Sequence, residues 1–167
     1  MAIGANATSF LIIGGVPVTL QTFFAIMCGI LLGSRLAAVS MSVYTLIGLA
    51  GAPVFANFRG GLNVIISPTF GFIISFIFVG FVVGLIIENC SVLNKKTYFL
   101  AAIVGLFTNY FIGTHYMYFA YHFISAFDAI PYLVIWGWMI PAFIKDLALT
   151  LLVVTIAPRV YGVLYSK

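Results

Sequence analysis

The sequence has very few charged residues, and this scarcity limits the class of protein. Only 6% of its 167 residues are Asp, Glu, Lys or Arg, against about 25% in a soluble domain. By contrast, 64% are hydrophobic and 17% aromatic. A chain of this length cannot build a core large enough to hide that much apolar surface from water. The composition therefore predicts an all-α integral membrane protein in a lipid bilayer and excludes a soluble domain.

Other scarce residue types exclude further classes. The seven Lys and Arg residues are not clustered, and all except Lys145 stand at segment ends or in loops, so they indicate membrane topology and not nucleic-acid binding. Cys28 and Cys90 are expected to act as small hydrophobes and not as a disulfide framework. His115 and His122 lack an evident third ligand, so we expect no metal site. No phosphate-binding Gly-x-x-x-x-Gly-Lys-Ser/Thr motif or other cofactor motif is present.

Hydrophobic runs predict six membrane segments in a single transmembrane domain over residues 1–167. The first run, residues 1–14, is shorter than the ~20 residues that a span needs. We interpret it as a truncated first helix, followed by a turn at Gly14–Pro17. The other predicted segments are Val18–Gly33, Leu36–Leu49, Pro68–Ile87, Thr97–Phe119 and Tyr132–Ala157.

The basic residues predict how the chain is oriented. If both termini are cytoplasmic, most of the basic residues in loops and ends lie inside, and only Arg59 lies outside. The inside residues are then Arg35, Lys95, Lys96, Arg159 and Lys167. The glycine-rich segment Gly51–Ser67, between the third and fourth predicted helices, becomes external. It is too apolar for a solvated linker, so we expect it to pack on protein as a lid.

Two adjacent charges in the last segment give the strongest indication of a binding site. Lys145 and Asp146 stand in an otherwise apolar run. A charge at mid-bilayer costs about 2.5–3.5 kcal/mol on insertion scales, so such residues usually face a cavity. Taking Pro141 as the start of the regular helix places the pair about 7.5 Å along it. Neighbours on a helix are not expected to face each other, and a structural ion pair to another helix is the alternative.

A polar face on the fifth segment adds further candidates. Asn109, Gly113 and Tyr116 lie at the spacing of one helix face. An amide, a small residue and a phenol would suit a ligand with a ring and polar edges. Helix–helix packing, with the glycine as the close contact, is an equally good explanation of this face.

Two groups of polar residues stand outside the predicted helix interiors. Thr19, Gln21 and Thr22 lie at the start of the second segment, where helix capping is the alternative to ligand binding. Asn57 and Arg59 lie on the predicted lid, from which they can reach a ligand or face water. Both groups are therefore candidates for one site near the outer face.

Five strings occur in order along the chain: Pro17-Val-Thr-Leu-Gln-Thr22, Leu32-Gly-Ser-Arg35, Gly48-Leu-Ala-Gly-Ala-Pro-Val-Phe-Ala56, Gly60-Gly61 and Pro68-Thr-Phe-Gly-Phe72. Together with the run Pro141–Asp146, they resemble the biotin-specific S components of energy-coupling-factor vitamin transporters, the BioY family. The resemblance covers the chain from Val16 onward. It differs at Leu149, where the family commonly has lysine, and in the first helix, where only Gly4 and Thr8 remain of a small-residue face.

The resemblance implies a six-helix S component in a prokaryotic plasma membrane that binds biotin from outside. It also implies partners, namely a transmembrane coupling subunit and two ATPase subunits, and it implies no enzymatic activity. The alternatives are an S component for a different vitamin, an intramembrane enzyme using Asp146 as acid or base, and a structural subunit without ligand.

With biotin as ligand, the candidate residues acquire expected roles. The ureido ring has two N–H donors and one carbonyl acceptor, and a buried carboxylate accepting N–H groups is a strong charge-assisted partner. Asp146 is therefore expected at the ureido N–H groups, with Asn109 or Asn57 as amide partner. Aromatic side chains enclose the remainder and a basic residue pairs the tail carboxylate. The predicted substrate-binding residues are Asp146, Lys145, Asn109, Asn57, Phe55, Arg59, Gln21 and Tyr116.

Overall fold

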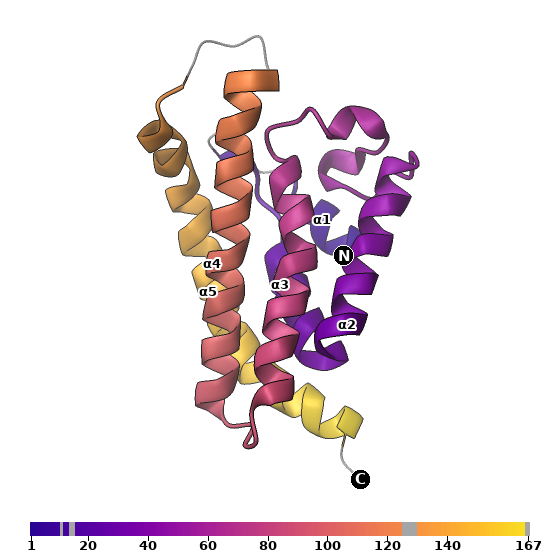
Figure 1. Ribbon diagram of the computed structural model, residues 1–167, viewed down its shortest axis with the longest axis vertical. Helices are drawn as coiled ribbons and strands as arrows, with labels where there is room; N and C mark the ends of the chain where they lie inside the picture. Colours follow the sequence, from indigo (N-terminus) through magenta and orange to yellow (C-terminus); the bar gives the residue numbers. More distant parts are fainter. Residues whose placement is uncertain (11, 14–15, 125–129, 166–167) are drawn as a thin grey trace.

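The computed structural model describes residues 1–10, 12–13, 16–124 and 130–165, and these are mostly helical. Four helices are long and apolar enough to cross a membrane, which confirms the helical membrane class. The elements in order are α1 (Ala2–Asn6), β1 (Ile12–Ile13), β2 (Val16–Pro17), α2 (Gln21–Leu49), η1 (Ala56–Phe58), η2 (Leu62–Val64), α3 (Phe70–Asn89), α4 (Lys95–Phe119), the π-helical η3 (Ala120–Ile124) and α5 (Tyr132–Tyr165) (Figure 1). The predicted turn residues Gly14 and Gly15, the connection over 125–129 and Lys167 lie outside the described residues.

The prediction of six spans is not confirmed, because the described residues contain four candidate spans. The first predicted helix, over residues 1–14, is wrong in its extent: α1 ends at Asn6, and Ile12 already pairs with Pro17 in an antiparallel hairpin. Asn6 bonds at both ends of its amide, with Nδ2 donating to the Ala2 carbonyl and Oδ1 accepting from the backbone N–H of Phe58. The helix therefore ends at the residue whose side chain connects it to η1.

Helix α2 contains a reversal at Gly33, where φ is +77° and ψ is 176°. Gln21 Nε2 donates to the Tyr44 hydroxyl at 3.0 Å, although a straight helix would separate residues 23 apart by about 35 Å. The chain therefore runs down through residues 21–32 and returns through residues 34–49, as Figure 1 shows. These two limbs match the predicted segments Val18–Gly33 and Leu36–Leu49, with glycine supplying the positive φ of the turn.

Helix α3 holds this turn in place. A Cβ added to Gly84 would lie 2.2 Å from the backbone nitrogen of Ser34, so the two backbones are in contact. One turn further on, Glu88 Oε1 accepts from the Ser34 N–H at 2.8 Å and Oε2 from the Ser34 hydroxyl at 2.6 Å. The carboxylate thus caps the N-terminal end of the second limb, where backbone N–H groups lack helical partners.

Helix α5 starts earlier than the sequence suggested. Taking Pro141 as its start is wrong, because α5 begins at Tyr132 and contains Pro141 and Pro158 in its interior. A proline costs the helix one hydrogen bond, here to the Gly137 carbonyl, and membrane helices tolerate this. Asp146 therefore lies about 21 Å along α5, near the middle of the helix.

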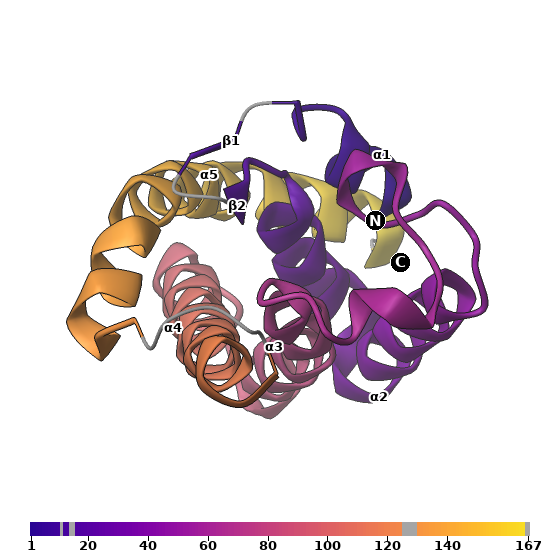
Figure 2. The same cartoon turned by 90° about the horizontal axis from the view of Figure 1, so that it is seen from above.

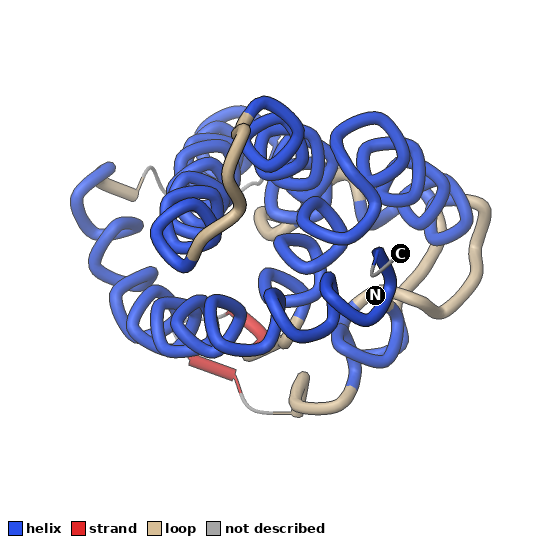
Figure 3. The backbone as a smooth tube through the Cα atoms, turned by 90° about the horizontal axis from the view of Figure 1, so that it is seen from below, coloured by secondary structure: helices blue, strands red, loops and turns tan. Residues whose placement is uncertain are grey.

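The helices form one bundle around a shared apolar core. Figure 2 shows α3 between α2 and α4, with α5 across from them and the strands beside α5. Figure 3, from the opposite side, shows the strands at the same edge of the bundle. The main buried cluster joins all four long helices and includes Ile26, Ile30, Val79, Val83, Ala101, Ala102, Val153 and Ala157.

Basic residues gather at one end of this bundle. In Figure 1 the α2 reversal, the α3–α4 link and the C-terminal part of α5 lie at the lower end, and the segment 51–67 lies at the upper end. Arg35, Lys95, Lys96 and Arg159 belong to the lower group and Arg59 to the upper one. The N mark lies near mid-height, so the structure does not place both termini at the same end.

We expect Gly84→Ala to lower the free energy of unfolding by about 1–3 kcal/mol, because its methyl group would press on the backbone of Ser34, which cannot yield as a flexible side chain can. The matched control is Gly162→Ala in α5, where nothing lies within 4 Å of the added methyl. That change is expected to be neutral or to stabilise by up to about 1 kcal/mol. Thermal unfolding in detergent measures both, and equal stabilities of the two variants would contradict the proposed contact.

Candidate functional site

A cavity lies between the helices beneath the segment 51–67. Its empty space is about 760 Å³, including the part open to the outside. Its apolar wall includes Pro17, Phe55, Val64, Phe72, Ile73, Phe76 and Met139. Its polar wall consists of Thr19, Gln21, Thr22, Asn57, Arg59, Ser67, Thr69, Asn109, Tyr110, Lys145 and Asp146.

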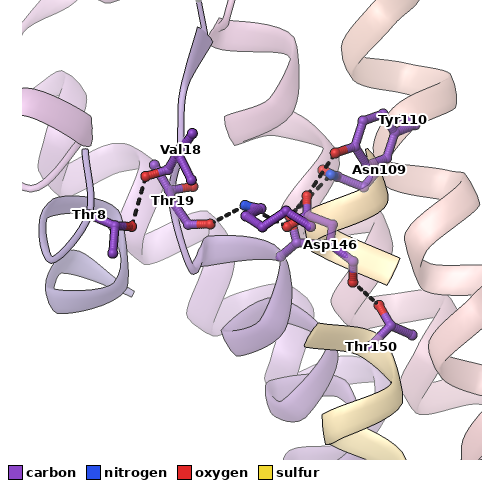
Figure 4. Close-up of polar contacts among 9 residues, drawn as sticks. Thr8, Val18, Thr19, Asn109, Tyr110, Asp146 and Thr150 are labelled. Atoms are coloured by element: carbon purple, nitrogen blue, oxygen red, sulfur yellow. Dashed lines mark hydrogen bonds and ion pairs between the residues drawn. The ribbon is translucent and has the colours of Figure 1, made fainter. Parts of the chain in front are cut away.

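Asp146 is the buried charge of this cavity, with 4% of the residue exposed. Its Oδ2 accepts two hydrogen bonds, from the Thr22 hydroxyl at 3.0 Å and from the Tyr110 hydroxyl at 2.9 Å (Figure 4). Among the described residues, its Oδ1 is buried and receives no hydrogen bond. A carboxylate oxygen can accept more than one hydrogen bond, so Oδ1 keeps acceptor capacity for a ligand.

Lys145 supplies the compensating charge. Its Nζ forms an ion pair with Asp146 Oδ1 at 2.6 Å and donates a hydrogen bond to the Thr19 carbonyl. The expectation that these neighbours do not face each other is wrong, because the two charged groups are in contact. The ammonium offsets the cost of burying the carboxylate. It also connects α5 to the strand segment that precedes α2.

Asn109 is linked to Asp146 through a chain of side chains. The amide is 2% exposed. Its Oδ1 accepts from the Ser75 hydroxyl at 2.6 Å, and its Nδ2 donates to the Thr22 hydroxyl at 3.3 Å. The chain therefore passes from α3 through α4 and α2 to α5, and one polar network joins the four long helices.

Gln21 connects the cavity to the segment above it. Its Nε2 donates to the Tyr44 hydroxyl, which in turn donates to the Val54 carbonyl at 2.9 Å. Phe55 follows in the chain, is 1% exposed and packs edge to face on Tyr44 with 5.5 Å between ring centroids. The segment therefore packs on protein at this point, as predicted for a glycine-rich lid.

The lid residues Asn57 and Arg59 also line the cavity. Asn57 has φ 59° and ψ 33°, a left-handed conformation that asparagine tolerates better than most residues. Arg59 is exposed, and within the described part of the chain no carboxylate lies within 4 Å of it. The bond from the Gly61 N–H to the Gly48 carbonyl, at 2.7 Å, fixes the lid next to this arginine.

Seven of the eight predicted residues line the cavity, and Tyr116 does not. The Tyr116 hydroxyl donates to the Ile65 carbonyl, and its ring lies 5.9 Å from that of Phe70, centroid to centroid. A Cβ on Gly113 would lie 2.3 Å from the Phe72 ring. Helix packing, the alternative given above, therefore accounts for Tyr116 and Gly113, and only Asn109 of that face reaches the cavity.

Sequence reasoning missed Tyr110 and Ser75 and undervalued Thr22. Helix capping, the alternative to ligand binding for Thr22, does not apply, because Leu20 occupies the N-cap position and no side chain caps α2. Ser75 is a lone hydroxyl within the apolar run of α3, a signal that was available. Tyr110 gave no separate signal, because a phenol in an aromatic-rich helix is ordinary.

We expect Lys145→Met to lower the free energy of unfolding by about 1–3 kcal/mol, because it leaves the Asp146 carboxylate without a cation; the partial exposure of Lys145, 27% of its side chain, reduces the cost. Adding Asp146→Asn should restore at least half of the loss, giving a coupling energy of about 1 kcal/mol or more in a double-mutant cycle. Thermal unfolding in detergent measures all three variants. Strictly additive effects would show that the two charges do not interact.

Comparisons with known proteins agree on one family. A family model for the BioY family matches residues 1–165. BioYB of Bacillus subtilis is 42% identical over 164 residues, which cover 96% of this chain and 82% of that protein. The biotin transporter BioY of Thermotoga maritima is 37% identical over 110 residues, covering 66% of this chain and 64% of that protein. The solved structure of the S-component for biotin from an ECF-type ABC transporter has the same fold, with a TM-score of 0.74 at 23% identity over 87% of this chain and 75% of that one.

Proposed function

The chain belongs to the BioY family, and we propose that it is the substrate-binding S component of an ATP-driven vitamin uptake transporter, with biotin as the ligand. The observation that carries the proposal is the Asp146 carboxylate, buried at 4% exposure on the wall of the cavity, whose Oδ1 is ion-paired to Lys145 and receives no hydrogen bond among the described residues. A carboxylate in this position suits a ligand that brings N–H donors, as the ureido ring of biotin does.

The ureido ring fits the polar end of the cavity. Asp146 Oδ1 accepts from the ring N–H, while Oδ2 stays occupied by Thr22 and Tyr110. The bond gains strength because the acceptor is ionised and shielded from water. The Asn109 amide, on the same wall, is the partner for the remaining polar edge of the ring.

The hydrocarbon part and the tail of biotin fit the other walls. Phe55, Phe72 and Met139 supply apolar surface for the thiophane ring and the aliphatic chain. Arg59, exposed and without a carboxylate partner within the described chain, pairs the tail carboxylate at the lid. Lys145 is already held by Asp146 and by the Thr19 carbonyl, which favours Arg59 for this role.

The membrane arrangement follows from the distribution of charge. The end of the bundle with Arg35, Lys95, Lys96 and Arg159 faces the cytoplasm, and the lid over the cavity faces outward. Biotin then enters from outside, in the plasma membrane of a prokaryote. Membership of the BioY family and the likeness to the S-component of an ECF-type ABC transporter support partners for delivery inward, namely a transmembrane coupling subunit and two ATPase subunits.

Asp146→Asn tests the central contact. The amide replaces one acceptor with a donor and removes the charge, so we expect the Kd for biotin in detergent to rise by about 10- to 100-fold. Glu88→Gln is the matched control, since this carboxylate caps Ser34 away from the cavity and its loss should leave affinity unchanged. Unaltered biotin affinity in a folded Asp146→Asn protein would refute the assignment.

The identity of the ligand is tested separately. We expect near-stoichiometric biotin to copurify with the protein, and labelled biotin to be displaced by unlabelled biotin but not by excess riboflavin or thiamine. The reason is that the cavity wall offers one buried carboxylate and one amide, which match a small ligand edge that carries both donors and an acceptor. Displacement by either of the other vitamins would instead identify an S component of different specificity.

A further inference from the structure

The hydrogen bonds on the cavity wall run in one direction, which the number of available hydrogens fixes. The Asp146 carboxylate only accepts, and it takes the hydrogen of the Thr22 hydroxyl at 3.0 Å. That hydroxyl has a single hydrogen, so it offers only lone pairs to Asn109. Asn109 must therefore point its Nδ2 at Thr22, at 3.3 Å, and its Oδ1 at Ser75.

Ser75 does not fix this direction by itself. Its hydroxyl lies 2.6 Å from Asn109 Oδ1 and 2.7 Å from the Phe72 carbonyl. If the amide were turned over, Ser75 could give its hydrogen to Phe72 and accept from Nδ2 without losing a bond. Only Thr22, whose hydrogen is committed to Asp146, distinguishes the two orientations of the amide.

We propose that Thr22 determines the ligand specificity of the site by making Asn109 present a donor to the cavity. The inference rests on the proposed biotin site. Nδ2 carries two hydrogens and Thr22 takes one, while Oδ1 is turned toward α3. What Asn109 offers a ligand is therefore an N–H, on the same cavity wall as the acceptor Oδ1 of Asp146.

This pattern selects a class of ligand edge. An acceptor beside a donor on the protein matches a planar edge with an N–H beside a carbonyl, as in a cyclic urea, a lactam or an imide. An edge that carries only donors is satisfied at Asp146 and meets another donor at Asn109. Such a mismatch leaves polar groups unpaired in a buried site, which is costly.

The test compares biotin with 2-iminobiotin, in which an imino group replaces the ureido oxygen and the protonated ring offers donors only. Calorimetry on the purified protein in detergent gives both Kd values for wild type, Thr22→Val, Thr22→Ser and Tyr110→Phe. In Thr22→Val the amide is free to turn over and accept. We therefore expect the Kd ratio of 2-iminobiotin to biotin to fall about tenfold, while Thr22→Ser keeps the wild-type ratio.

Tyr110→Phe is the matched control. It removes the other hydroxyl donor from the same Asp146 oxygen, at 2.9 Å, and among the described residues this hydroxyl forms no hydrogen bond with Thr22, Asn109 or Ser75. It should weaken the binding of both ligands alike and leave the ratio of their Kd values unchanged. If Thr22→Val acted only through a general disturbance of Asp146, the two variants would change this ratio equally.

An unchanged ratio in Thr22→Val, or an equal fall in Tyr110→Phe, overturns the inference. If Thr22→Val does not fold, Thr22→Ala carries the same expectation in the same assay. A wild-type protein that binds neither ligand overturns the proposed function itself. Normal biotin binding with an unchanged ratio in the threonine variants overturns the role of Thr22 alone.

Discussion

Asp146 places a carboxylate near the middle of a helix apolar enough to cross a membrane, with 4% of the residue exposed. An isolated charge there is costly, so its surroundings are built to reduce that cost. Hydroxyls from α2 and α4 bond one oxygen, and the ammonium of Lys145 lies beside the other. Because these partners come from different helices, stabilising the charge also fixes how the helices meet.

The partners converge because α2 turns back on itself. The first limb brings Gln21 and Thr22 to the cavity, and the second returns alongside it with Tyr44 and Gly48, which hold the lid. The turn that permits this lies at the opposite end of the bundle, at Gly33, where the backbones of Gly84 and Ser34 are in contact. The return of the second limb thus depends on close backbone contact with α3, which in a lipid environment largely replaces the hydrophobic effect.

Features that depend on composition and local sequence could be predicted, and those that depend on contacts between helices could not. Scarce charge gave the membrane class, and a charge in an apolar run singled out Lys145 and Asp146. The pairing of Thr22 with Asp146, 124 residues apart, depends on which helix faces meet, and a single sequence does not contain that information. The helix start assigned to Pro141 failed for a local reason, since a membrane helix tolerates an internal proline.

Oδ1 of Asp146 is ion-paired to Lys145 but receives no hydrogen bond among the described residues, so it keeps acceptor capacity in the proposed binding site. A fixed hydrogen-bond donor at this oxygen would compete with the proposed ligand for it. If a ligand binds there, it also stabilises the folded protein, so binding and folding stability are coupled. Gln21 extends this coupling, because it lines the same cavity and its bond to Tyr44 supports the Val54 carbonyl at the start of the lid. A ligand that orders the cavity wall therefore also orders the segment that covers it.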